Sequence, residues 1–443
     1  MKRYSYIIIG LLAALVTACD TNTTTTAKSS VAQLTAFSFA KNDTMPGLAK
    51  AVFTVEERLD TGLVWNKDSI QYGTRLEKVV PRFVFASTPG SAYLRTADTL
   101  CILTGYDTLD FTKTPIYLTI RSQDGSTTKT YEIRPTVHTK DPDLYEWTQL
   151  KDAIYLLDDS EQRVLELDKR FVMVKSNGYE LDVFSSEDGI DWTHLGEPTG
   201  LPDGTGVRQI ISNGDTLFYG KDDYVYTSTD GLLWTAHSVS YPVSTMVLYW
   251  NKRVWAMVDN NGRELALWNG TDLEPSGLKT SEDDFPVSDF ATVCFHSASG
   301  RERAMIMGGF AESGRALNSR WNLEYSRHTP ENNGYRLQEF SVDRPAFKAL
   351  TGISVIWYNN RLLMFGGVDA DMKYQGRDIL ISTDEGLNWT AADTTKNKLP
   401  EVYTARQKQT ALVRDNYIYL FGGQDAYATY SDVYRGKLNS IDW

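Results

Sequence analysis

Cysteine and histidine are scarce in this sequence, which has 3 Cys and 5 His among its 443 residues. The histidines are His138, His194, His237, His296 and His328. No two of them stand at the i, i+2 or i, i+4 spacing that is typical of metal ligands. Cys101 and Cys294 lie far apart in apolar runs and are expected to be buried thiols, so a disulfide framework is excluded. We therefore predict no metal site and no cofactor.

Positive charge is also lacking, because 45 Lys and Arg stand against 57 Asp and Glu, for a net charge of -12. This excess of negative charge argues against nucleic acid and anionic lipid surfaces as partners. The sequence contains neither a glycine-rich phosphate loop nor a Gly-x-Ser-x-Gly nucleophile motif. These absences favour a binding protein over an enzyme.

The N-terminus carries a targeting signal rather than part of a fold. The basic Lys2 and Arg3 precede an apolar run, Ile7 to Val16, that is too short to span a bilayer. The run ends in Val16-Thr17-Ala18-Cys19, which resembles a bacterial lipobox. The resemblance implies a signal peptide over 1–18 and lipidation of Cys19, while an ordinary secretion signal that ends near a cysteine is the alternative. Residues 19–30 are rich in Thr and Ser and predict a flexible tether.

Residues 31–137 alternate apolar and polar positions with the period of β-strands. The clearest unit is a hairpin, in which Ile116–Ile120 and Lys129–Ile133 flank an Asp124-Gly125 turn. Several short strands in about a hundred residues predict an immunoglobulin-like β-sandwich. Residues 138–144 are expected to form the linker that follows it.

From residue 145 to residue 443 the chain repeats an apolar strand followed by turns about every fifty residues, a period typical of β-propellers. The repeated strands are Phe171–Val174, Leu217–Gly220, Val254–Met257, Met305–Gly308, Leu363–Gly366 and Ile418–Phe421. We therefore predict an all-β chain whose second domain is a six-bladed β-propeller. We also expect residues 145–150 to pair with the C-terminal strand and close the ring, with Trp443 buried there.

Two motifs recur within these repeats. The segments Ser186–Trp192, Ser228–Trp234 and Ser382–Trp389 each place an Asp before a Gly and a Trp. They resemble the Asp-box of sialidases and other propellers, which implies structural roles on the rim for Asp188, Asp230 and Asp384. The di-glycines at 308–309, 366–367 and 422–423 resemble those of the kelch repeat.

Three arginines are candidates for binding an anion or a glycan. Arg208, Arg344 and Arg406 lie in loops that are expected to enter innermost strands and to face the central channel. Guanidinium groups suit carboxylates and sulfates. A sialidase-like hydrolase would use such a three-arginine clamp. However, the Arg-Ile-Pro motif of that family is missing, and spacing assigns no Tyr/Glu pair.

The complete arrangement resembles a family of Bacteroidota cell-envelope lipoproteins with an immunoglobulin-like domain and a kelch or galactose-oxidase-like propeller, classed as a domain of unknown function. The resemblance implies architecture and an outer-membrane location, but no activity. We predict a lipid-anchored binding protein for a glycan or an envelope protein. A sialidase-like hydrolase and a structural partner of an envelope complex are the alternatives. The ligand, the membrane face, calcium binding and the oligomeric state stay open.

Overall fold

The structure, a computed structural model, describes residues 27–155, 160–328, 331–340 and 348–442. The chain divides into two compact units, one up to Asp141 and one from Pro142 onward. The predicted signal peptide and Cys19 lie outside the described residues. Within the described ranges, no helix is both long enough and apolar enough to cross a membrane.

The first unit consists of a six-stranded sheet, a separate two-stranded sheet and a short helix. Its elements are β1 (Leu34–Phe39), α1 (Gly47–Lys50), β2 (Thr54–Glu56), β3 (Thr61–Trp65), β4 (Pro81–Phe85), β5 (Ser91–Arg95), β6 (Leu100–Ile102), β7 (Ile116–Arg121) and β8 (Thr128–Arg134). The larger sheet has the order β2-β3-β8-β7-β5-β6, and β1 pairs with β4. One apolar core takes side chains from both sheets, including Phe37 of β1 and Leu118 of β7.

The expected hairpin is confirmed, because β7 and β8 pair antiparallel from Ile116–Ile133 to Arg121–Thr128. Its turn is held by Asp124, whose Oδ1 accepts the backbone N–H of Ser126 at 2.9 Å and the hydroxyl of Ser122 at 2.6 Å. Gly125 supplies the left-handed conformation that the turn requires, with φ of +75°.

The second unit is built from antiparallel sheets that follow one another along the chain. Four of them have four strands each: β10 (Glu161–Leu167), β11 (Arg170–Ser176), β12 (Leu181–Ser186) and β13 (Thr193–Gly196); β20 (Ala291–His296), β21 (Glu302–Met307), β22 (Arg320–Tyr325) and β23 (Tyr335–Glu339); β25 (Ser354–Tyr358), β26 (Arg361–Phe365), β28 (Leu380–Ser382) and β29 (Thr390–Ala391); β30 (Thr410–Arg414), β31 (Tyr417–Gln424), β32 (Thr429–Leu438) and β9 (Tyr145–Lys151). The strands β24 (Leu350–Thr351) and β27 (Val368–Asp369) form a separate pair.

A six-stranded sheet lies between the first and second of these in sequence. It has the order β14 (Ile211–Ser212), β15 (Leu217–Ser228), β16 (Thr235–Trp250), β17 (Arg253–Asp259), β18 (Arg263–Trp268) and β19 (Leu273–Lys279). The two long strands β15 and β16 each run through both halves of this sheet. The pairing of β15 with β16 shifts register between Asp222 and Tyr224, which divides the sheet into these halves. The 3-10 helices are η1 (Val207–Gln209), η2 (Glu331–Gly334) and η3 (Asn439–Asp442).

Buried apolar clusters join each sheet to the next, and the last sheet packs against the first. The closing cluster contains Phe171 of β11 together with Tyr419 and Phe421 of β31. The ring of Phe171 lies 5.0 Å and 5.1 Å from those two rings, measured between centroids. The sheets therefore form a closed ring.

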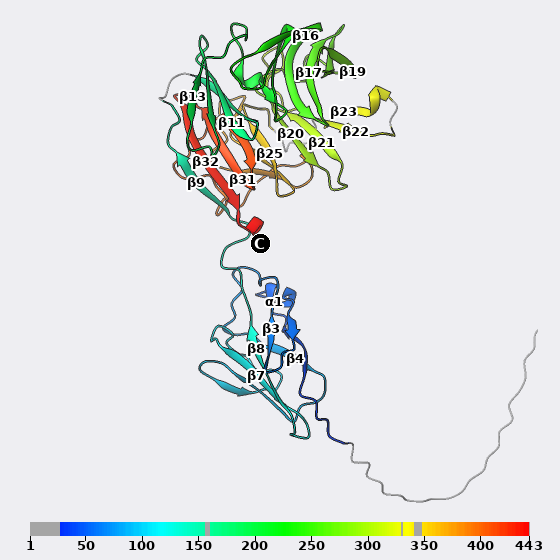
Figure 1. The fold of residues 1–443 in the computed structure, drawn as a ribbon, viewed down its shortest axis with the longest axis vertical. Helices are drawn as coiled ribbons and strands as arrows, with labels where there is room; N and C mark the ends of the chain where they lie inside the picture. The colour runs from blue at the N-terminus through cyan, green and yellow to red at the C-terminus, as the bar shows by residue number, and fades with distance from the viewer. Residues whose placement is uncertain (1–26, 156–159, 329–330, 341–347, 443) are drawn as a thin grey trace, which may run out of the picture. The chain divides into compact units, whose positions relative to one another are not determined.

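The expected pairing of the two chain ends is confirmed (Figure 1). Strand β9 pairs antiparallel with β32, from Tyr145–Leu438 to Lys151–Val433. Gly436 stands opposite Trp147, and a Cβ at that glycine would lie 2.5 Å from the indole ring. The indole thus occupies the space that the glycine leaves open. Trp443 lies outside the described residues.

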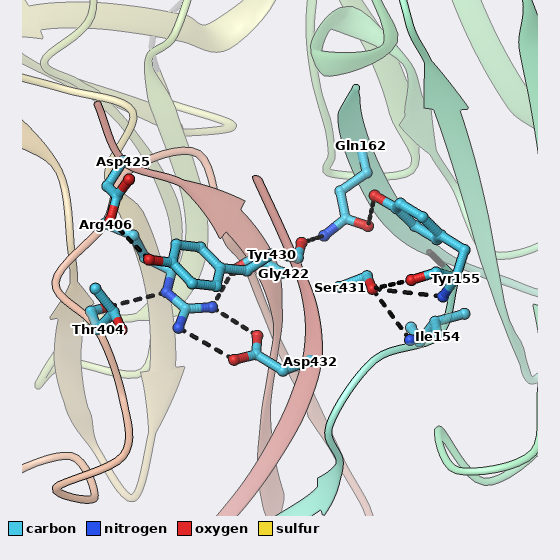
Figure 2. Close-up of polar contacts among 10 residues, drawn as sticks. All are labelled: Ile154, Tyr155, Gln162, Thr404, Arg406, Gly422, Asp425, Tyr430, Ser431 and Asp432. Carbon is cyan, nitrogen blue, oxygen red and sulfur yellow. Dashed lines mark hydrogen bonds and ion pairs between the residues drawn. The ribbon is translucent and has the colours of Figure 1, made fainter. Parts of the chain in front are cut away.

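Polar contacts also stabilise the region where the two chain ends meet, which we call the closing seam (Figure 2). The hydroxyl of Ser431 on β32 accepts the backbone N–H of Ile154 at 3.1 Å and donates to the carbonyl of Tyr155 at 3.0 Å. The side chain of Gln162 on β10 donates to the carbonyl of Tyr430 at 2.9 Å. Ile154 and Tyr155, which follow β9, and Gln162 of β10 are therefore bonded to the last sheet.

Candidate functional site

A small cavity lies where several sheets of the ring converge. We call it the central cavity; its volume is about 160 Å³, and it is lined by Glu161, Arg163, Gly206, Arg208, Gln209, Ile211, Met246, Val247, Ser288, Asp289, Phe290, Thr292 and Lys408. An adjoining cavity of about 140 Å³ shares Arg163, Arg208, Phe290 and Thr292 with it and continues along β25 and β30. Both cavities are thus lined by innermost strands and by the loops that enter them.

Two arginines in the central cavity are positioned by backbone carbonyl groups. Arg163 lies on β10, and its Nη1 donates to the carbonyl of Arg208 in η1. The Nη1 of Arg208 in turn donates to the carbonyl of Lys408 at 2.7 Å. Within the described part of the chain, neither guanidinium forms an ion pair with a carboxylate, and the buried Nε of Arg208 has no hydrogen-bond partner.

Lys408 is paired with two carboxylates of the same cavity. Its Nζ contacts Oε1 of Glu161 and lies 3.5 Å from Oδ2 of Asp289. These three groups come from β10 and from the loops before β20 and β30, so the ion pairs join distant parts of the chain.

The backbone around these ion pairs adopts a conformation that side chains rarely take. Asp289 and Lys408 have φ of +50° and +59°, and Gly352 between them has φ of +61°. The N–H of Gly352 donates to the backbone carbonyl of Asp289 at 2.9 Å, and the carbonyl of Gly352 accepts the N–H of Lys408 at 2.7 Å. A Cβ at Gly352 would lie 2.9 Å from Cβ of Gln407, so only glycine fits. Left-handed non-glycine residues cost about 1 kcal/mol or more each and concentrate at functional sites.

The electrostatics of the cavity leave positive charge on the arginines. Burial, and after it the positive charge of Arg208, lowers the pKa of Arg163 from 12.5 to about 9. Burial also lowers the pKa of Arg208, while Asp289 and Glu161 act in the opposite direction. Both guanidinium groups stay charged at neutral pH. With Lys408 and the two carboxylates included, the five groups carry three positive and two negative charges.

Arg406, one of the three predicted anion-binding arginines, has a different environment (Figure 2). Its side chain is 1% exposed and forms two hydrogen bonds with Asp432, at 2.6 Å and 3.1 Å. It also donates to the carbonyls of Thr404 at 2.9 Å and Gly422 at 3.2 Å, and its Cζ lies 3.8 Å from the ring centroid of Tyr430. The guanidinium group is thus surrounded by side chains and carbonyl groups of the same chain.

The predicted arginine clamp is therefore not assembled among the described residues. Arg208 lies in the central cavity, Arg406 is paired with Asp432, and Arg344 lies outside the described ranges. Sequence reasoning missed Arg163, Lys408, Glu161 and Asp289. Lys408 could have been found from the sequence because it lies in the same loop as Arg406. Arg163 could have been found because it lies in the strand that precedes the first repeated strand.

The three Asp-Gly-Trp turns have nearly identical hydrogen bonding. Asp188 Oδ1 accepts the N–H groups of Ile190 and Asp191, Asp230 Oδ1 those of Leu232 and Leu233, and Asp384 Oδ1 that of Asn388, all at 2.8–2.9 Å. Burial acts to raise the pKa of each carboxyl, but these hydrogen bonds outweigh it and lower the pKa. The indole N–H of each turn's Trp donates to the Gly carbonyl, at 3.0–3.2 Å.

Each of these turns also packs on the neighbouring sheet. Gly189 lies against Tyr419 of β31, Gly231 against Val172 of β11, and Gly386 against Met305 of β21. The contacts are local and intramolecular, which fits a structural role for the three carboxylates. Among the described residues, no group of three His, Cys, Asp or Glu side chains could hold a metal ion.

Two family models match the chain. The DUF6242 beta propeller domain matches residues 141–443, and the N-terminal domain of the domain of unknown function DUF6242 matches residues 20–134. The second unit is thus a β-propeller. Among solved structures, "Structure of YjhT" is 13% identical, covers 63% of this chain and 95% of that chain, and has a TM-score of 0.43. A comparison with curated proteins found no match.

Proposed function

The chain belongs to the DUF6242 family, and we propose that this member is a ligand-binding protein of the bacterial cell envelope. It binds a glycan or an envelope protein where the central cavity opens between the propeller loops. The observation that carries the proposal is the convergence of five ionised side chains from four separate segments of the chain. Propellers suit this task because rigid sheets hold loops that vary in sequence.

The finer architecture is part of the proposal. The six-stranded sheet represents two blades that share the long strands β15 and β16, which gives the ring six blades. A buried cluster that joins Phe218 and Val225 of one half to Val254 and Val258 of the other supports this division. The Asp-Gly-Trp turns are Asp-boxes, the di-glycine segments belong to kelch-like repeats, and the first unit is an immunoglobulin-like spacer.

The location follows from the lipobox-like segment of the sequence. Lipidation of Cys19 anchors the chain in the outer membrane of a Bacteroidota cell. Residues 19–30 then separate the folded units from the bilayer. Several acyl chains on one cysteine give stable attachment, which a single chain does not.

A glycan array probed with residues 27–443, which include both folded units, tests this function. We expect retention of a restricted set of glycans, and weaker retention of the same set by Arg208→Gln. The matched control is Arg301→Gln, because Arg301 is exposed and lies outside the cavity. If the folded protein retains no glycan, or if Arg208→Gln binds like the parent, glycan recognition at this cavity is refuted.

A further inference from the structure

We infer that the central cavity binds one oxyanionic group, a carboxylate or a sulfate carried by an acidic glycan, between Arg163 and Arg208. The inference rests on the proposed function and specifies the chemistry of its ligand.

Positive charge is left over in the cavity. Lys408 already has two carboxylate partners, Glu161 and Asp289. Neither Arg163 nor Arg208 forms an ion pair with a carboxylate among the described residues, and the positive charge of Arg208 acts, after burial, to lower the pKa of Arg163. A bound monoanion could interact with both guanidinium groups and would balance the one positive charge left among the five side chains.

The two arginines also supply hydrogen-bond donors to the cavity. Each guanidinium presents several N–H groups in a planar fork. For Arg163 and Arg208, one Nη1 each is used by a backbone carbonyl, which fixes the side chain in place. The Nε of Arg208 is buried and without an acceptor among the described residues, which is costly unless a ligand supplies one.

The size of the cavity limits the part of a ligand that it can hold. Pockets that enclose whole small molecules usually measure about 300–1,000 Å³. The central cavity has about 160 Å³ and its neighbour about 140 Å³, so they fit the charged end of a ligand rather than a complete oligosaccharide. The rest of the glycan would then lie against the surrounding loops.

The net charge of the chain favours a ligand with one isolated anionic group over a polyanion. A total of -12 repels nucleic acids and densely charged polymers, whereas two arginines can bind a single isolated group. An acidic glycan with separated carboxylates or sulfates meets this condition.

Calorimetry and thermal melting of residues 27–443 test the inference with defined probes: sodium sulfate, glucuronic acid, galactose 6-sulfate and neutral glucose. We expect the three oxyanions to bind and to raise the melting temperature, and glucose to do neither. Arg163→Gln and Arg208→Gln should each weaken binding at least about tenfold. Arg163→Lys should weaken it as well, since lysine keeps the charge but loses the fork. The tighter binder of glucuronic acid and galactose 6-sulfate shows whether the site prefers a carboxylate or a sulfate.

Arg301→Gln is again the matched control and should bind like the parent. The melting temperature of each variant without ligand shows whether it has folded. Equal binding by the parent and a folded Arg163→Gln variant would overturn the inference, and so would preference for an acidic peptide over every acidic sugar. If the array selects neutral glycans, the proposed function stands and the inference falls. If sulfate and glucuronic acid bind but no glycan does, the anion site stands and glycan recognition falls.

Discussion

Replacing Arg406 with methionine should destabilise the propeller without affecting the central cavity. The arginine makes four hydrogen bonds, two of them to Asp432 (Figure 2). Its Cζ lies 4.4 Å from the ring centroid of Tyr403 and 3.8 Å from that of Tyr430. Methionine keeps much of the apolar volume but none of these polar contacts. Asp432, which is 7% exposed, would then be a buried carboxylate without a counter-ion.

The expected magnitude follows from that uncompensated charge. Removing one partner of a buried ion pair costs about 3–5 kcal/mol, because the remaining ion has lost both water and its partner. In a unit of this size, each kcal/mol lowers the melting temperature by about 2 °C, so the loss should be about 6–10 °C. Replacing both residues, as Arg406→Met with Asp432→Leu, should recover part of the loss, since no charge is then left buried.

Urea unfolding and thermal melting measure the change in stability, and sulfate titration measures the affinity of the central cavity for an anion. We expect a large loss of stability in Arg406→Met with unchanged sulfate affinity, and the converse in Arg208→Gln. If Arg406→Met melts like the parent, the ion pair has no structural role. If it melts like the parent and also loses sulfate, Arg406 belongs to an anion site and our placement of it is refuted.

Three further predictions concern other parts of the chain. Cys19→Ala should release the protein from membranes or leave its precursor uncleaved, and unchanged detergent-phase partitioning would contradict lipidation. Asp384→Ala should cost about 1–3 kcal/mol with ligand affinity intact, because turn N–H groups lose their acceptor. Since the pKa of Asp384 is lowered on folding, its contribution is present at neutral pH and is lost as the pH falls through the folded-state pKa. The parent and the variant should therefore converge in stability in acid, and a constant difference would refute this. Deleting residues 439–443 should lower the melting temperature of the second unit alone, because Asn439 and Ser440 bond the carbonyls of Leu144 and Pro142; melting like the parent would contradict that role.

The parts of the fold that sequence predicted well depend on local interactions. In the turn of Asp188, the carboxylate, the glycine and the tryptophan interact within a few residues, so the spacing alone carries the geometry. The hairpin at Asp124-Gly125 is local in the same way. The pairing of β9 with β32 joins distant residues, but it was predictable because each chain end holds an incomplete set of strands.

The central cavity was not predictable in the same way, because its contacts join residues far apart in sequence. Lys408 and Glu161 lie 247 positions apart, and no local pattern marks either of them. Arg406 and Lys408 share one loop, and sequence spacing favoured the arginine as the residue that faces the channel. The structure instead encloses Arg406 with Asp432, whereas Lys408 lines the cavity.

The central cavity adjoins the contact between the first and last sheets of the ring, because Glu161 of the cavity is next in sequence to Gln162, which bonds the last sheet. Glu161 begins β10, the strand that follows the seam, and Lys408 precedes β30 of the last sheet. Their ion pair therefore crosses from the last sheet to the first, beside the contact of Gln162 with Tyr430. An anion bound between Arg163 and Arg208, as we propose, would lie beside this junction. If it binds the closed ring and not the opened one, its binding would stabilise the closed ring. The proposed site therefore predicts that bound sulfate raises the melting temperature of the propeller.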